Sequence, residues 1–248
     1  MDLSTFPPIA VVLDGLYSIV TALGELVSPF AGEAGAALGV VLFTLLVRLV
    51  LVPVGVSQVR AEVGRRRLAP AIADLNRRIT DPPARSRALM ALYSSEKVSP
   101  LAGCLPTLAQ APVLTAVYSL FVHADIAGHA NALLTHTLGG AALGANLFAT
   151  LGAGLAAVWP YAVLLVLLAI VVELSRRATL RFTGPAATPA AGPGKEALPG
   201  MTGLLRWLPF LSVAFAAFAP LAAGLYLVTS AAWTLGERAV LRRVLTRA

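Results

Sequence analysis

The sequence has little charge and almost no cysteine. Only 12% of its 248 residues are Asp, Glu, Lys or Arg, about half the share of a soluble globular domain. The single cysteine, Cys104, excludes an internal disulfide and a metal site built from cysteines. Hydrophobic residues instead make up 58% of the chain, and the mean hydropathy is +0.81. This composition excludes a water-soluble enzyme and predicts an all-α polytopic membrane protein, stabilised by helix packing in lipid.

Basic residues are missing from two long stretches. Residues 1–47 contain four acids and no Lys or Arg, and residues 123–157 also lack both. Eighteen of the nineteen basic residues lie in three blocks, 60–97, 176–206 and 238–247. Because Lys and Arg mark cytoplasmic loops, we expect these blocks inside and the two basic-free stretches outside. The net charge of +7 therefore indicates topology and not specific DNA binding.

The membrane spans follow from uncharged runs, because a hydrocarbon core of roughly 30 Å takes about 20 helical residues to cross. The last apolar stretch, 207–236, is too long for one upright helix. A turn at Pro220 and Gly224 gives two short spans and returns the basic C-terminus to the cytoplasm. We therefore predict five spans, with the N-terminus outside and the C-terminus inside. They are residues 34–58, 99–122, 158–177, 203–218 and 219–237, and Trp159, Pro160 and Tyr161 open the third at an interface.

The segments outside the spans differ in character. Residues 1–33 hold apolar residues at helical spacing from Ile9 to Phe30, with Asp14 and Glu25 on the opposite face, which predicts an amphipathic helix in the interface plane. The alternative, a sixth span, would place an acidic, arginine-free tail in the cytoplasm. The remaining segments are an external loop at 123–157, a flexible linker at 178–202 and a basic cytoplasmic tail at 238–248.

A helical hairpin is predicted for residues 59–98. Apolar residues from Val63 to Ile79 form a stripe among arginines, and Asp81 followed by Pro82 combines an N-cap with proline at the first helical position. Connections between spans need only a few residues, so this length favours a partner-binding element over a solvated connector.

Four motifs stand in a fixed order along the chain. Ser99 to Pro106 reads SPLAGCLP; Phe43 to Arg48 reads FTLLVR with Pro53 behind it; Leu89 to Tyr93 reads LMALY; and Gly224 to Tyr226 is followed by Thr229, Ser230 and Trp233. Together they resemble the YidC/Oxa/Alb membrane insertase family, in its bacterial form, over about residues 9–245. The signature positions are Pro100, Gly103, Cys104, Pro106, Pro112, Tyr118, Gly224, Tyr226 and Trp233. The sequence departs from the family at Ser99 and Ala231, where the family usually has Asn.

The resemblance implies an activity without an enzymatic step or a cofactor. Family members insert and fold integral membrane proteins in the bacterial cell membrane, so nascent membrane proteins are the implied clients. The ribosome and the Sec translocon are implied partners beside the lipid bilayer. For the basic tail, ribosome binding and a simple topology signal both remain open.

Arg48 is the one basic residue inside a predicted span. It lies twelve residues before Arg60 and fifteen after Glu33, which at 1.5 Å per residue places it roughly 18 and 22 Å from those charges. A guanidinium at such depth costs about 2.5–3.5 kcal/mol on insertion scales unless water or polar groups surround it. Snorkelling is the alternative, although a side chain of roughly 6 Å does not cover this depth without water entering.

Three polar residues are candidates to surround Arg48. Thr44 is one turn earlier on the same helix face, while Gln110 and Ser230 come from the second and fifth predicted spans. Gln110 and Ser230 have the alternative of simply bonding a neighbouring helix. We expect a hydrated groove that lowers the barrier for polar client tails.

Two other functions and one metal site are alternatives to this interpretation. An anion transporter or channel would use Arg48 as its substrate site, but the sequence shows no internal repeat and no carboxylate relay within the spans. An assembly factor that stabilises clients after insertion is poorly distinguished from an insertase. His123, His129 and His136 are spaced by six and seven residues, so no metal site is predicted.

Overall fold

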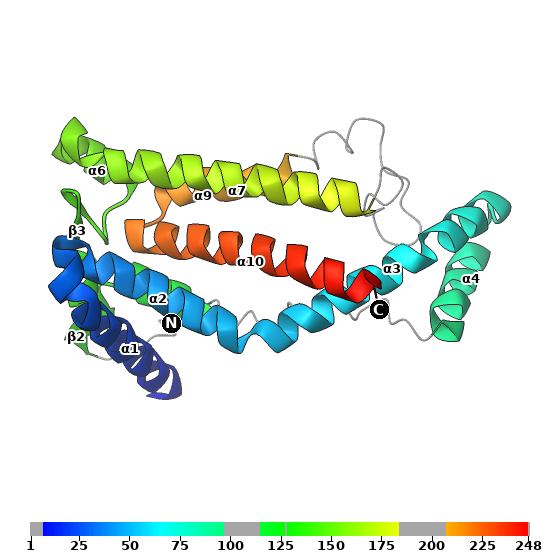
Figure 1. The fold of residues 1–248 in the computed structure, drawn as a ribbon, viewed down its shortest axis with the longest axis horizontal. Helices are drawn as coiled ribbons and strands as arrows, with labels where there is room; N and C mark the ends of the chain where they lie inside the picture. Colours follow the sequence, from blue (N-terminus) through cyan, green and yellow to red (C-terminus); the bar gives the residue numbers. More distant parts are fainter. Residues whose placement is uncertain (1–6, 97–114, 127, 184–206, 248) are drawn as a thin grey trace. The chain divides into compact units, whose positions relative to one another are not determined.

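The computed structural model describes residues 7–96, 115–126, 128–183 and 207–247. These parts are nearly all helical, as predicted (Figure 1). The helices are α1 (Pro7–Ala31), η2 (Gly32–Ala34), α2 (Gly35–Val50), α3 (Val52–Arg78), α4 (Pro82–Ser95), η3 (Ala132–Thr135), α6 (Leu147–Ala153), η4 (Leu155–Ala157), α7 (Trp159–Thr183), η6 (Leu208–Phe210), α9 (Leu211–Phe218) and α10 (Leu221–Arg247). Residues 115–122 are also helical.

Four strands of two residues each are the exception to the all-α prediction. They are β1 (Asp125–Ile126), β2 (His129–Ala130), β3 (Thr137–Leu138) and β4 (Ala141–Ala142). Both pairs are antiparallel, with Asp125 opposite Ala130 in the first and Thr137 opposite Ala142 in the second. The turn between β3 and β4 consists of Gly139 and Gly140, which both have positive φ, as a two-residue hairpin turn requires.

The described residues divide into two compact units. The first unit contains residues up to 51, 115–172 and 210–234, and the second contains residues 52–96, 173–183, 207–209 and 235–247. Helices α7 and α10 contribute to both units.

In the first unit, α1 and α2 form a tightly packed pair (Figure 1). A Cβ at Gly39 would lie 2.8 Å from the backbone nitrogen of Gly24, so only glycine allows this approach. Gly35 packs on Ser28 in the same way, so these two glycines, four residues apart on one face of α2, allow the close helix contact. By length and composition, the stretch Ala10–Val50, which takes in most of α1, η2 and α2, contains a helical segment long and apolar enough to cross a membrane.

The first predicted span does not end where the sequence indicated. Residues 34–58 were expected as one helix, yet α2 ends at Val50 and a new helix starts at Val52. Pro53 explains the break, because it has no N–H to donate to Leu49 and its ring would clash with that carbonyl in a continuous helix. At the second position of α3 the missing donor costs nothing. The predicted hairpin boundary near residue 59 therefore falls inside α3.

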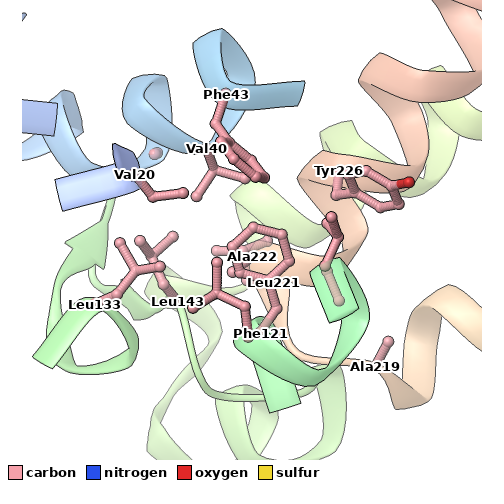
Figure 2. Packing of buried hydrophobic residues seen from close by; sticks show 14 of the residues in the cluster. Val20, Val40, Phe43, Phe121, Leu133, Leu143, Ala219, Leu221, Ala222 and Tyr226 are labelled. Atoms are coloured by element: carbon pink, nitrogen blue, oxygen red, sulfur yellow. The ribbon is translucent and has the colours of Figure 1, made fainter. Parts of the chain in front are cut away.

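The core of the first unit joins α1, α2, residues 115–122, the loop at 123–157 and the start of α10 (Figure 2). Val20, Val40 and Phe43 face Phe121 and Leu143, all almost fully buried. A second cluster packs α9 on α7 through Ala216, Leu168 and Val172. The loop predicted to lie outside therefore contributes core side chains, which composition did not indicate.

A break separates α9 from α10 at Ala219 and Pro220, where the sequence predicted a turn. Gly224, expected in that turn, lies inside α10 instead, and a Cβ there would be 2.9 Å from Leu164 of α7. Gly224 thus serves helix packing. The helix also continues to Arg247, so no helix end separates the predicted fifth span from the tail.

In the second unit, α3 and α4 are two helices that follow one another in the segment where a hairpin was predicted. The Asp81 side chain accepts a hydrogen bond from the backbone nitrogen of Ala84 at 3.0 Å, with Pro82 as the first residue of α4. The predicted N-cap and proline position are confirmed.

Candidate functional site

Arg48 on α2 and Ser230 on α10 lie in direct contact. The Nε atom of Arg48 donates to the Ser230 hydroxyl oxygen at 2.8 Å, and its Nη2 atom donates to the same oxygen. Arg48 is half-buried and Ser230 is buried. Among the side chains that the structure describes, Arg48 forms no ion pair, so its charge faces one neutral partner. A guanidinium has five N–H donors, and the bonds that the described residues form with Arg48 from Nε and Nη2 both go to Ser230.

Two residues next to this pair are fully packed. Thr44, one turn before Arg48, is buried and its hydroxyl donates to the Val40 carbonyl at 2.7 Å. Tyr226, one turn before Ser230, is buried with its ring 6.3 Å from that of Phe121. Thr44 therefore bonds its own helix, and Ser230 is the polar group that meets the guanidinium.

The other predicted site residues fall into two groups. Gln110, Pro100, Gly103, Cys104, Pro106 and Pro112 lie outside the described residues. Tyr118 is half-exposed on the helix 115–122, and Trp233 is partly buried on α10 one turn beyond Ser230.

The loop at 123–157 closes one end of the core of the first unit. Its backbone carbonyls at Ala145 and Leu143 accept hydrogen bonds from Leu221 and Ala222, the first two residues of α10, at 3.0 and 2.9 Å. Helix N-termini leave N–H groups without intrahelical partners, and here the loop supplies the acceptors.

Tyr161 completes this closure, and sequence reasoning missed its role. It was expected at an interface, but its side chain is fully buried. Its hydroxyl donates to the carbonyls of Ala145 and Ala219, the latter at 3.1 Å. Asn131 acts similarly, because its amide donates to the carbonyls of Leu120 and His123 at the end of the helix 115–122. Neither residue had a sequence signal beyond being polar.

An apolar hollow of about 120 Å³ lies between α7 and α10 in the first unit. Its walls include Trp159, Val163 and Leu167 from α7 and Leu225 and Val228 from α10, with Thr229 as a polar member. No charged side chain lines it.

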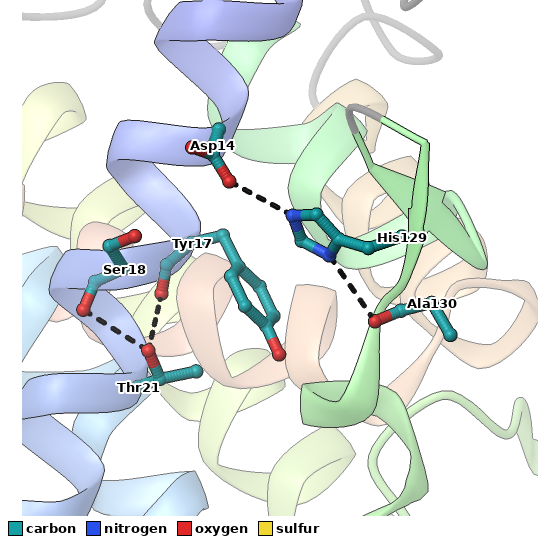
Figure 3. Close-up of polar contacts among 6 residues, drawn as sticks. All are labelled: Asp14, Tyr17, Ser18, Thr21, His129 and Ala130. Carbon is teal, nitrogen blue, oxygen red and sulfur yellow. Dashed lines mark hydrogen bonds and ion pairs between the residues drawn. The ribbon is translucent and has the colours of Figure 1, made fainter.

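A polar contact joins α1 to the loop (Figure 3). The Nε2 atom of His129 lies 2.9 Å from the Asp14 carboxylate, and the His129 ring packs on Tyr17 with ring centroids 5.2 Å apart. The hydrogen bond with Asp14 raises the pKa of His129 above its usual 6.5. Asp14 was expected on the solvent face of an interfacial helix, and half of its side chain remains exposed.

The second unit contains a buried charged cluster on three helices. Arg242 of α10 donates to the Glu62 carboxylate of α3 at 2.6 and 3.3 Å and to the Ala178 carbonyl of α7 at 3.3 Å. Phe182 lies beneath both Arg242 and Arg66, with the guanidinium carbons 4.6 and 4.4 Å from the ring centroid. Sequence reasoning assigned Arg242 only to a basic tail. The sequence signal available for this cluster was Glu62, an acidic residue in a segment rich in arginine.

Several known proteins similar to this chain carry the same name. The "Membrane protein insertase YidC" of Clostridium perfringens strain 13 is 38% identical over 93 residues, which cover 37% of this chain and 39% of that protein. The protein of the same name from Stenotrophomonas maltophilia strain K279a is 36% identical over 123 residues, covering 49% and 20%. That of Shewanella sp. strain W3-18-1 is 37% identical over 106 residues, covering 42% and 19%. The matches thus span less than half of these relatives.

A family match covers far more of the chain than these pairwise similarities. Residues 27–248 match the family described as "60Kd inner membrane protein". The matched region includes Arg48, Ser230 and every signature position named above. The chain therefore belongs to the 60Kd inner membrane protein family, which is the YidC/Oxa/Alb family that its motifs resemble.

Proposed function

We propose that this protein inserts and folds integral membrane proteins, and that Arg48 attracts the polar segments of its clients within a hydrated groove. Family membership and the name shared by the relatives support an insertase. They do not favour the anion transporter. Nascent membrane proteins are the proposed clients, and no cofactor or enzymatic step is needed.

The observation that carries the mechanism is the pairing of Arg48 with a neutral hydroxyl. A structural arginine deep in a membrane protein would pair with a carboxylate, because an uncompensated charge is costly there. Arg48 instead bonds the neutral hydroxyl of Ser230. Water must then solvate the charge of the guanidinium. The same water shortens the water-free part of the bilayer that a client's polar tail has to cross.

The closed end formed by the loop supports a groove that opens on one side only. Leu133, Leu143 and Tyr161 are almost fully buried there. With the predicted topology, in which the loop is external, the groove opens to the cytoplasm and to lipid. The five-span arrangement with an external N-terminus is part of this proposal.

The hairpin of α3 and α4 is the proposed first contact for clients or for the ribosome. Arg77 and Arg78 are exposed in the last turn of α3, and α4 buries none of its residues. The Sec translocon remains a proposed partner through the family alone. Deleting residues 65–90 should therefore reduce client insertion while the spans stay folded.

The test compares one single-span client that has an acidic tail with its neutralised form. Purified chain in liposomes is assayed for protease protection of the client. Arg48→Ala should reduce protection of the acidic client about tenfold and of the neutral client much less, whereas Arg48→Lys should retain most activity, since a point charge suffices for attraction at a distance. Arg181→Ala, which removes the same charge at an exposed position at the end of α7 and outside the hairpin, is the matched control. Equal losses for both clients would show that Arg48 is structural.

A further inference from the structure

The second half of the loop, residues 147–158, is apolar on its outside. Residues 137–172 contain no Asp, Glu, Lys, Arg or His, whereas residues 123–136 contain Asp125 and all three histidines. Phe148 is 54% exposed, Leu151 43% and Leu155 81%. A water-facing loop does not ordinarily present several large apolar side chains together.

The polar groups of this segment are turned inward and bonded. Asn146 caps α6 by accepting from the Ala149 nitrogen at 2.8 Å, and the buried Thr150 donates its hydroxyl to the Asn146 carbonyl at 2.8 Å. These are the last polar side chains before Trp159. The backbone is helical in α6 and η4, and Val158 donates to the Leu155 carbonyl. Internal bonding of this kind is what a segment needs in order to leave water for lipid.

The segment is also fixed beside helices that the proposed topology places in the membrane. The rings of Phe148 and Phe218 have centroids 5.1 Å apart, which joins α6 to the end of α9. Phe215 and Phe218 of α9 are themselves exposed, and so is Trp159 at the start of α7. The exposed face of α6 and η4 therefore continues the exposed apolar faces of both neighbours.

We infer that α6 and η4 dip into the bilayer, with Phe148, Leu151 and Leu155 in contact with lipid at the boundary of headgroups and acyl chains. Amphipathic segments bury an apolar face at this depth while their polar groups stay satisfied. Lipid is favoured over a protein partner because this face is continuous with the membrane faces of α7 and α9. The loop therefore divides in function: exposed residues before 137, such as His129 and Thr135, face water, and residues 147–158 belong to the membrane.

Photocrosslinking tests this placement without a client. Benzoylphenylalanine is incorporated at Leu155, at Phe148 and at the exposed Thr135 as the matched control, and each protein is reconstituted in vesicles of phosphatidylethanolamine and phosphatidylglycerol. After irradiation, mass spectrometry should detect lipid adducts at 148 and 155 in at least tenfold excess over 135.

A pair of variants at Leu155 distinguishes specific lipid contact from non-specific crosslinking. Leu155→Asp should lower the lipid adduct at position 148 severalfold, whereas Leu155→Phe should preserve it. Equal adduct yields at 155 and 135, or crosslinked dimers in place of lipid adducts, would overturn the inference. Because the readout needs no insertion activity, its failure is distinguishable from failure of the proposed function.

Discussion

Arg242 and Glu62 form a two-point ion pair that joins α10 to α3. The Nη2 and Nε atoms of Arg242 bond the two carboxylate oxygens of Glu62, and only 8% and 18% of the two side chains are exposed. A pair this buried is costly to break from one side, because the remaining charge stays desolvated.

The first prediction concerns this pair. Arg242→Ala should lower the free energy of unfolding by roughly 3 kcal/mol, the lower end for a broken buried pair because Glu62 keeps some exposure. Titration with sodium dodecyl sulfate in mixed micelles measures this change. Removing both charges, as Arg242→Met with Glu62→Gln, should recover most of the loss. The exposed neighbour variant Arg243→Ala is the control and should change little; a loss as large as that of Arg242→Ala would contradict the assignment.

The second prediction concerns Tyr161. Tyr161→Phe removes the hydroxyl that donates to Ala145 and Ala219, and a buried polar group without its partner costs about 1–3 kcal/mol. The midpoint of thermal unfolding in detergent should fall, and amide exchange at Leu221 and Ala222 should accelerate. Tyr118→Phe, at a half-exposed position, serves as the comparison. Unchanged exchange at the start of α10 would show that the hydroxyl does not secure the loop.

The third prediction is a pair of glycine substitutions with opposite signs. Gly39→Ala puts a Cβ 2.8 Å from backbone atoms of α1 and should destabilise the protein by about 1–3 kcal/mol through overpacking. Gly15→Ala has open space around the added carbon and should stabilise the helix by roughly 0.5–1 kcal/mol. Both are measured by the same detergent titration. If Gly39→Ala also stabilises, the close contact of α1 and α2 is wrong.

The fourth prediction is a pH dependence at the Asp14–His129 contact. Because the pKa of His129 is raised in the folded protein, its contribution to stability is fully present below about pH 6.5, the ordinary histidine pKa. It is lost as the pH rises through the folded pKa. Wild type should therefore exceed Asp14→Asn in thermal midpoint at pH 5.5 and lose that advantage at pH 8.5. An advantage independent of pH would refute this prediction. Both side chains are half-exposed, so the effect is small.

Several features were predictable because they depend on neighbours in the sequence. The capping of α4 by Asp81, the break near Pro220 and the helical character of residues 9–30 all follow from local backbone chemistry or periodicity. The helix break at Leu51 was predictable in the same way from Pro53. It was missed because the long apolar run around it was interpreted as one span. Family membership was also readable, because the motifs keep their order along the chain.

What sequence alone determined was the class of molecule: an apolar, nearly all-helical chain whose arginines are segregated and whose Arg48 stands alone in an uncharged run. Only the tertiary structure decided which polar groups meet. Arg48 and Ser230 are 182 residues apart, and Arg242 and Glu62 are 180 apart. Composition and periodicity report which face of a helix is apolar, whereas such pairs depend on how distant helices pack. For the same reason the loop at 123–157 looked like a solvent-exposed connection, and only its packing revealed hydrogen bonds that cap α10.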